Sequence, residues 1–295
     1  MIRLSWVVFV HAILLSFESI LIEVLTTQLS LAPLVIAGNS IMIAGAALLA
    51  ISAARGKSLN ITIFRAWRIL LPASALLAVG VFAWYDSVTY IGASKEGLLS
   101  GPLEVVVIIM LARLVLKERL SRPQAAGATI ALAGFFATIV SAGSLDLLFT
   151  WGDVEAIISA MAFGTGIIMI TRLAKNYSAL EITGASLLIS GVILAAAMWS
   201  SAPLISLSDW AVILGFSLLP LFAAYTYVVG LARIGASATS IIGSFSILLT
   251  VVFQLGLVIL GAAAILPANI PLAITGGALG IFGIYLIHRQ RGNGL

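Results

Sequence analysis

The sequence predicts an all-α integral membrane protein of ten transmembrane helices, arranged as two inverted five-helix repeats with both termini in the cytoplasm. Three observations predict this fold class: the composition, a series of long apolar runs, and a repeated segment. The chain has 295 residues, of which 62% are hydrophobic and 9% charged, whereas soluble domains carry about 25% charged residues. No stretch of the chain is polar enough to form a separate soluble domain.

The apolar runs define the predicted spans. A helix needs about 20 mostly apolar residues to cross about 30 Å of hydrocarbon. Arg3 before the first run resembles the start of a signal peptide, but Glu18 and Glu23 interrupt the run, which predicts a retained helix. In chain order the predicted spans cover residues 6–26, 33–54, 69–90, 97–116, 124–142, 156–171, 182–199, 211–231, 237–260 and 270–287.

The basic residues predict the topology. All of the 15 Lys and Arg residues except Lys95 fall on one side of the ten predicted spans. The positive-inside rule makes that side cytoplasmic and places both termini there. Lys95 and its neighbour Glu96 are expected to be solvated loop charges on the opposite side. The basic residues are scattered between apolar runs, so they indicate topology and not a nucleic-acid partner.

A repeated segment divides the chain into two halves. Ile91-Gly92-Ala93-Ser94 recurs as Ile234-Gly235-Ala236-Ser237. The first copy joins the third and fourth predicted spans, and the second copy joins the eighth and ninth. An odd number of spans separates the copies, so they lie on opposite sides of the membrane, as in the inverted repeats of many transporters. The predicted repeats are residues 1–145 and 146–295; chance recurrence between Ala- and Gly-rich helices is the alternative.

Four acids lie within the predicted spans of the first half. They are Glu18, Glu23, Asp86 and Glu104. A charged side chain inside a membrane costs at least about 2.5–3.5 kcal/mol on insertion scales, and no Lys or Arg lies at the same depth. A low-dielectric environment favours the protonated form of an acid, so these four are candidate proton-coupling groups. The alternatives are structural hydrogen bonds between helices or, for Asp86 and Glu23, contact with headgroup water.

Proline and glycine adjoin one of these acids. Gly101 and Pro102 predict a helix break beside Glu104. Proline frees backbone carbonyls, which a membrane tolerates only where protein or a cavity satisfies them. The position of Glu104 beside this predicted break favours a functional role for Glu104 at a cavity.

Five further residues are candidates for binding a substrate. Aromatic side chains could stack on a substrate or make cation–π contacts with an amine, and an amide could bind its polar groups. The alternatives are aromatic packing or lipid contact, and a helix-to-helix hydrogen bond from the amide. The candidates are Asn39, Trp84, Tyr85, Tyr225 and Tyr227.

The residues that the chain lacks exclude several kinds of chemistry. It contains no cysteine, which excludes disulfides, thiolate metal sites and thiol catalysis. It contains two histidines and no Ser/His pair or cluster with metal-ligand spacing. We therefore predict no catalytic residue, metal or cofactor, and no enzymatic activity. A cavity with acids and no cations would also suit phosphates and nucleotide sugars poorly.

One stretch of the chain resembles a known family. Tyr90-Ile91-Gly92-Ala93-Ser94, Pro102 and Leu116-Lys117-Glu118-Arg119-Leu120, followed by Gln124, Gly127 and Gly134, resemble the ten-helix EamA-type branch of the drug/metabolite transporter superfamily. The small multidrug transporters are similar here and carry a functional glutamate in their first helix, where Glu18 holds a comparable place. The chain departs from the family pattern at Asn39, where an arginine is frequent. The second repeat also lacks a proline near 245–246 and a glutamate near Gly261.

These observations together predict a secondary transporter of the cell membrane, in which one five-helix bundle rocks against the other. The expected substrates are small neutral, zwitterionic or cationic organic molecules such as amino acids, amines or drugs, exchanged for protons through Glu18 or Glu104. The resemblance implies export. A lipid-carrier flippase of the same superfamily and an intramembrane enzyme built on paired acids are the alternatives. The partners of the predicted transporter would be the substrate, protons and the lipid bilayer. The sequence favours neither a monomer nor a homodimer.

Overall fold

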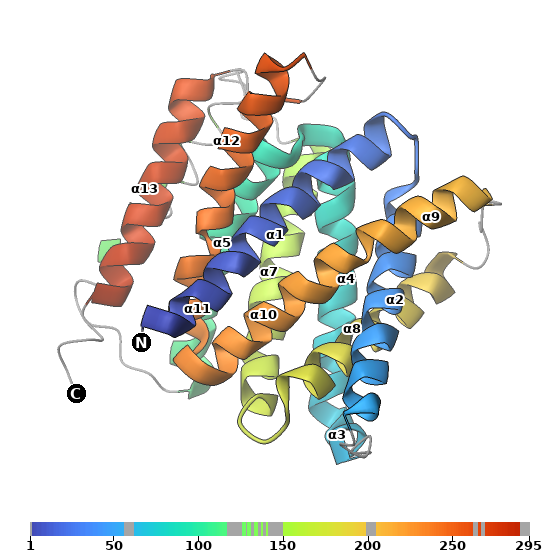
Figure 1. Cartoon of the computed structure of the whole chain (residues 1–295). Helices are drawn as coiled ribbons and strands as arrows, with labels where there is room; N and C mark the ends of the chain where they lie inside the picture. Colours follow the sequence, from blue (N-terminus) through green and yellow to red (C-terminus); the bar gives the residue numbers. More distant parts are fainter. Residues whose placement is uncertain are drawn as a thin grey trace.

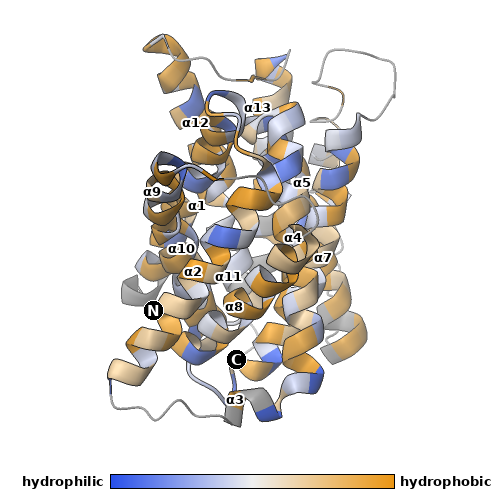
Figure 2. Cartoon of the chain, turned by 90° about the vertical axis from the view of Figure 1, so that its right-hand side faces the viewer, coloured by the Kyte–Doolittle hydropathy of each residue, from blue (hydrophilic) through white to orange (hydrophobic). Residues whose placement is uncertain are grey.

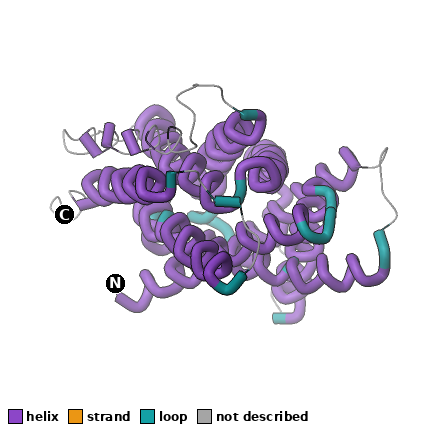
Figure 3. Tube along the Cα trace, turned by 90° about the horizontal axis from the view of Figure 1, so that it is seen from above, coloured by secondary structure: helices purple, strands orange, loops and turns teal. Residues whose placement is uncertain are grey.

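The described part of the chain consists of helices and short connections. The computed structural model describes residues 2–55, 62–116, 150–198, 205–261, 265–266 and 269–289, with scattered positions between 126 and 140. No strand occurs among these residues, and the helices form one bundle (Figures 1 and 3). In chain order the helices are α1 (Ile2–Thr27), α2 (Pro33–Ala54), α3 (Thr62–Arg65), α4 (Trp67–Ile91), α5 (Ala93–Leu116), α7 (Trp151–Leu173), α8 (Ala179–Met198), α9 (Leu207–Phe216), α10 (Leu218–Ile234), α11 (Ala236–Gly243), α12 (Phe245–Ile259) and α13 (Ile270–Arg289).

These helices coincide with every predicted span except the fifth. The predicted span 124–142 lies largely outside the described residues, so the count of ten stays a prediction. Two predicted spans are each divided into two helices. Ser217 separates α9 from α10, and Ser244 separates α11 from α12. By contrast, α5 continues as helix through Pro102, so the predicted break at Gly101 and Pro102 is wrong.

The reason α5 can continue is local packing. Proline removes one backbone hydrogen bond from a helix and crowds the preceding turn. Here the Pro102 ring lies against Gly280 of α13, and Gly101 leaves room for Ile247 of α12. The neighbouring helices therefore enclose this turn closely enough to keep it helical.

Several helices are long and apolar enough to cross a membrane. In the described part of the chain these are six, by length and composition: α1, α2, α4, α7, α8 and the combined stretch of α9 and α10. The α12 helix and most of α13 are shorter apolar helices. Figure 2 shows apolar residues along most of the length of these helices. Their length and composition are those of a multi-pass membrane protein.

Helices of the first half pack mainly on helices of the second half. The α1 helix packs on α10 and α12, α2 on α8, and α4 on α7, while α5 contacts α7, α12 and α13. Lipid tails are as apolar as leucine, so helices in a membrane associate through close packing at small residues. A methyl group at Gly45 would overlap the backbone of Leu188, and one at Gly191 would overlap that of Met42. Glycine therefore sets the close approach of α2 and α8.

The repeated segment has one backbone conformation in both copies. Gly92, between α4 and α5, has φ 78° and ψ 157°, and Gly235, between α10 and α11, has φ 84° and ψ 167°. Only glycine adopts such positive φ values without strain. In Figure 1 the α4–α5 junction lies at the top of the bundle, and the α10–α11 junction lies toward the bottom. The two copies thus have the same fold at opposite ends of the molecule.

The exposed basic residues whose side chains are described, unlike the buried Lys95, gather at one end. In Figure 1, α3 lies at the bottom of the bundle, and α1 begins and α13 ends at the left in its lower half. Exposed basic side chains occur beside α3, after α7 and at the end of α10. They are Arg55, Arg65, Arg68, Arg172, Lys175 and Arg233.

Candidate functional site

A cavity of about 210 Å³ lies in the centre of the bundle. Residues from α1, α2, α4, α5, α7, α8, α10, α11 and α12 line it. Its walls are mostly apolar, with serine and threonine hydroxyls from several helices. Three carboxyl side chains also line it, those of Glu18, Glu96 and Glu104, and no lysine or arginine of the described chain does.

Glu18 is held by a buried tyrosine. The hydroxyl of Tyr85 donates a hydrogen bond of 2.7 Å to Glu18 Oε1. Tyr85 is fully buried, and its ring packs edge-on against Trp84 and Phe216. Tyr85 does not line the cavity itself, so its role in this geometry is to orient Glu18.

Glu96 and Glu104 come from one face of α5. Residues four apart on a helix lie on the same face, so Glu96, Ser100 and Glu104 follow one another along the cavity wall. Glu96 is 2% exposed, which makes the expectation of a solvated loop charge wrong. The α5 helix begins at Ala93, before the predicted start at residue 97, and its first turn therefore lies inside the bundle.

The neighbours of these two carboxyls leave one oxygen of Glu96, and the carboxyl of Glu104, without a described hydrogen-bond donor. Ser100 and Trp84 interact with the Glu96 side chain, but Glu96 Oε1 has no hydrogen-bond partner in the described part of the chain. No described residue donates a hydrogen bond to Glu104. Spacing along α5 could have indicated Glu96 from the sequence, because it continues the face of Glu104 by two helical turns.

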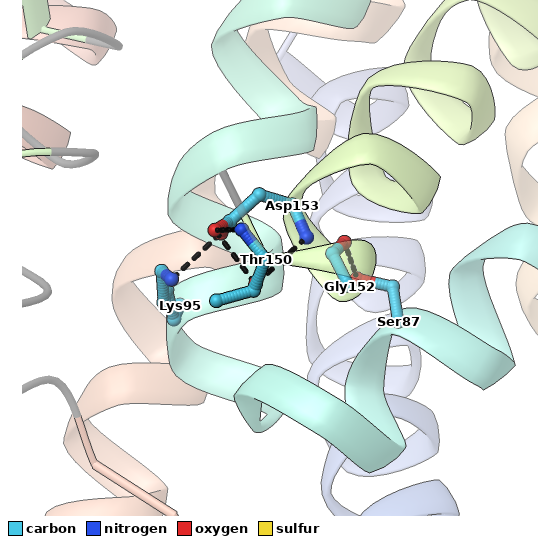
Figure 4. A network of polar contacts seen from close by, with 5 residues as sticks. All are labelled: Ser87, Lys95, Thr150, Gly152 and Asp153. Atoms are coloured by element: carbon cyan, nitrogen blue, oxygen red, sulfur yellow. Dashed lines mark hydrogen bonds and ion pairs between the residues drawn. The ribbon is translucent and has the colours of Figure 1, made fainter. Parts of the chain in front are cut away.

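Lys95 is also buried, and here too the expectation of a solvated charge is wrong. Its exposure is 7%, and its Nζ lies 2.6 Å from Asp153 Oδ1 at the start of α7 (Figure 4). Asp153 Oδ2 accepts hydrogen bonds from the backbone and hydroxyl of Thr150, which caps α7. Ser87 of α4 donates to the carbonyl of Gly152 at 2.8 Å. The ion pair therefore ties α5 to α7 and holds the Lys95 ammonium at Asp153, and Lys95 does not line the cavity.

Glu23 lies near the same first turn of α5. Its carboxylate accepts hydrogen bonds from the Ala93 backbone (2.8 Å), the Gln254 side chain (2.6 Å) and the Ile265 backbone (2.6 Å). Gln254 Oε1 in turn accepts from the backbone and hydroxyl of Ser94. We call Glu23, Ser94, Lys95, Asp153 and Gln254 the α5 N-terminal network. Three donors satisfy Glu23, and this geometry favours a structural role for it.

The remaining acid and amide candidates lie outside the cavity. Asp86 is half-buried on α4 and interacts with Glu155 of α7. Asn39 is buried on α2, and its Nδ2 donates to the Val35 carbonyl of the same helix at 2.9 Å. Neither Asp86 nor Asn39 lines the cavity.

The aromatic candidates divide into two groups. Trp84 and Tyr227 line the cavity, whereas Tyr85 lies behind it and Tyr225 packs in the apolar core beside it. The Tyr227 hydroxyl lies 3.1 Å from Ser240 Oγ. Its ring lies 4.7 Å from that of His11, whose Nδ1 donates to the Ala223 carbonyl at 2.9 Å. Gly101 also lines the cavity, while Pro102 does not.

Long apolar helices packed around a central cavity are the features of a multi-pass membrane protein. A family model described as the EamA-like transporter family matches residues 4–140 and, a second time, residues 150–289. The chain belongs to the EamA-like transporter family. It is therefore a multi-pass membrane transporter of the drug/metabolite type, which confirms the resemblance and agrees with the prediction that it is not an enzyme.

A solved structure supports the fold. A crystal structure of a protein that is 21% identical in sequence aligns over 98% of this chain and 99% of that chain, with a TM-score of 0.70. At this identity the likeness shows the fold alone. No curated protein matches the chain.

Proposed function

We propose that this chain is a proton-coupled secondary active transporter that exports small organic metabolites across the cell membrane. The substrates would be neutral, zwitterionic or cationic molecules such as amino acids, amines or drugs. The observation that carries the proposal is the central cavity, which Glu18, Glu96 and Glu104 line without a described lysine or arginine. The family match supports transport, and the cavity supports the choice of substrate and ion.

Unpaired carboxyls in a membrane provide a means of coupling. A carboxylate inside a membrane is costly unless a proton or a cation neutralises it. A proton and a cationic substrate would therefore compete for the same groups, which is the basis of exchange. Of the four acids expected to couple protons, Glu18 and Glu104 line the cavity, and we assign proton coupling to these two. Glu23 and Asp86 lie outside the cavity, and we propose structural roles for them.

The arrangement of the two halves supports an alternating-access mechanism. The junctions at Gly92 and Gly235 share a conformation at opposite ends of the bundle (Figure 1), as inverted repeats require. The gap between the two family matches lies near the proposed boundary of repeats 1–145 and 146–295. Exposed basic residues lie beside α3, and α1 begins and α13 ends in the same lower half of the bundle (Figure 1), which supports cytoplasmic termini. Export follows from the family resemblance.

A lipid-carrier flippase fits the cavity less well. Lipid carriers bear phosphate groups, which arginine and lysine bind through charge-assisted hydrogen bonds. No described lysine or arginine lines the cavity. We therefore favour a substrate without phosphate.

The test is flux into and out of proteoliposomes under an imposed pH gradient. The wild-type protein is expected to accumulate amines and cationic drugs in the direction opposite to the proton flow. Glu18→Gln and Glu104→Gln should each abolish the dependence on the gradient while leaving the melting temperature close to wild type. Unchanged proton-coupled flux in both variants would refute the assignment of coupling to these residues.

A further inference from the structure

Glu96, in the first turn of α5, has a carboxyl oxygen without a described partner, and this oxygen indicates a narrower class of substrates. We infer that Glu96, Ser100 and Trp84 form an ammonium subsite and that the cavity selects primary amines over the amino acids from which they differ by one carboxylate. This inference rests on the proposed transport function and concerns the same cavity.

Glu96 has the geometry of a group that awaits a donor. Its side chain is 2% exposed and lines the cavity, and its Oε1 has no hydrogen-bond partner in the described part of the chain. A buried acceptor without a donor costs about 1–3 kcal/mol, and a charged one costs more. A primary ammonium carries a positive charge and three N–H donors. It can therefore supply Glu96 with both a donor and a compensating charge, whereas a neutral ligand can supply only a donor.

The neighbouring side chains suit the same ligand. Ser100 lies one turn further along α5 and offers a hydroxyl acceptor. Trp84 of α4 lines the cavity and interacts with Glu96, and its ring is fixed edge-on against Phe163, with centroids 6.2 Å apart. Indole is the most favourable aromatic partner for a cation. A carboxylate, a hydroxyl and an indole are thus combined at one point of the wall.

The length of the α5 face favours an elongated cation. Glu104 lies eight residues beyond Glu96, which corresponds to about 12 Å along the helix axis. Both carboxyls line the cavity. A linear diamine bound at Glu96 would therefore extend its second ammonium toward Glu104.

Apart from His11, whose Nδ1 donates to the Ala223 carbonyl, the described cavity lining has no basic side chain that could pair with a substrate carboxylate. No described lysine or arginine lines the cavity, and Lys95, the neighbour of Glu96, is held at 2.6 Å by Asp153. A substrate carboxylate would instead meet three carboxyl groups, and like-charge contacts oppose binding. An amino acid should therefore bind more weakly than the amine that lacks its carboxylate.

Matched ligand pairs test this inference on the purified full-length protein in detergent. The pairs are cadaverine and lysine, agmatine and arginine, and tyramine and tyrosine, whose members differ only in the carboxylate. Thermal stabilisation and isothermal titration should show binding of the amines, with each amino acid at least about tenfold weaker. Equal affinity within the pairs, or no binding of any amine, would overturn the inference.

Variants locate the subsite. Glu96→Gln should weaken amine binding by about tenfold or more, since it removes a charged hydrogen bond. Glu155→Gln is the matched control, because Glu155 is also buried with an unpaired oxygen but does not line the cavity; it should bind amines as the wild type does. Amine affinity unchanged in Glu96→Gln would mean that Glu96 holds only a proton or water, and the ammonium subsite would be refuted.

Binding and transport failures are distinguishable. The binding assay needs neither a membrane nor a pH gradient. Selective amine binding without gradient-driven flux would refute the proposed function and leave the subsite supported. Gradient-driven flux of other substrates, without amine selectivity, would refute the subsite alone.

Discussion

The α5 N-terminal network and the central cavity both contain buried ionisable side chains, but those of the network have more hydrogen-bond and ion-pair partners. In the network, Lys95 is matched by Asp153, and Glu23 accepts three hydrogen bonds. In the cavity, Glu96 keeps an oxygen without a described partner, and Glu104 receives no hydrogen bond from a described residue. Paired charges hold helices together, whereas unpaired charges are available to a ligand. The contrast separates the groups that build the bundle from those that can bind.

One turn of helix connects the two regions. Ala93, Ser94 and Lys95 contact Glu23, Gln254 and Asp153 in succession, which joins α5 to α1, α12 and α7. Glu96 is the next residue and faces the cavity. The turn that holds α5 to these three helices is therefore the same turn that presents Glu96 to the cavity.

The largest effect is expected from breaking the buried ion pair. Asp153→Asn leaves Lys95 without its partner at 8% side-chain exposure, and removing one partner of a buried pair costs about 3–5 kcal/mol. The melting temperature of the purified protein should fall strongly. The double variant Lys95→Met with Asp153→Asn removes both charges and should recover most of the loss. If the double variant melts no higher than the single one, the ion pair does not account for the loss.

A smaller effect is expected at Glu23. Glu23→Gln replaces one acceptor oxygen by a donor, which leaves at least one of the N–H groups of Ala93, Ile265 or Gln254 without a partner. A buried donor without an acceptor costs about 1–3 kcal/mol, so the melting temperature should fall.

Transport by the same variant distinguishes the two regions. Proton-coupled flux per folded molecule should be preserved in Glu23→Gln, whereas Glu18→Gln should lose it. Loss of coupling in Glu23→Gln at normal stability would move Glu23 from the structural group to the coupling group.

Much of the fold could be predicted from local sequence. The predicted span 33–54 has the same bounds as α2, because Pro33 begins the helix and Arg55 follows its last apolar turn. Glu18 and Glu104 were predicted within spans as isolated acids, and the structure brings both to one cavity. These results depend on apolar length and on single charges, which a sequence displays directly.

The start of α5 could not be predicted in the same way. Lys95 and Glu96 follow a glycine turn between two apolar runs and therefore look like solvated loop charges. Their environment comes from Asp153 and Trp84, and that of the preceding residues from Glu23 and Gln254. These partners are distant in sequence, and only packing of the helices brings them together. For this reason Glu96 was not among the predicted site residues, although its spacing from Glu104 is visible in the sequence.

The smallest effect is expected at Tyr85, which makes Glu18 intermediate between the two regions. Glu18 lines the cavity as Glu96 does, but its Oε1 accepts a hydrogen bond from Tyr85, whereas Glu96 Oε1 has no described partner. Tyr85→Phe removes that donor and should lower stability by about 0.5–1.5 kcal/mol, measured as a lower melting temperature. Tyr285→Phe, at an exposed position of α13, is the control and should melt as the wild type does.

The same variant tests where the ammonium lies. If Glu96 holds it, freeing Glu18 from Tyr85 should leave the affinity for cadaverine within about twofold of the wild-type value. A change of tenfold or more in Tyr85→Phe, with Glu96→Gln unaffected, would place the ammonium at Glu18 instead. The ammonium would then lie at the carboxyl that Tyr85 holds and not at the one with an oxygen free of a described partner, and pairing would no longer separate structural from binding charges in this chain.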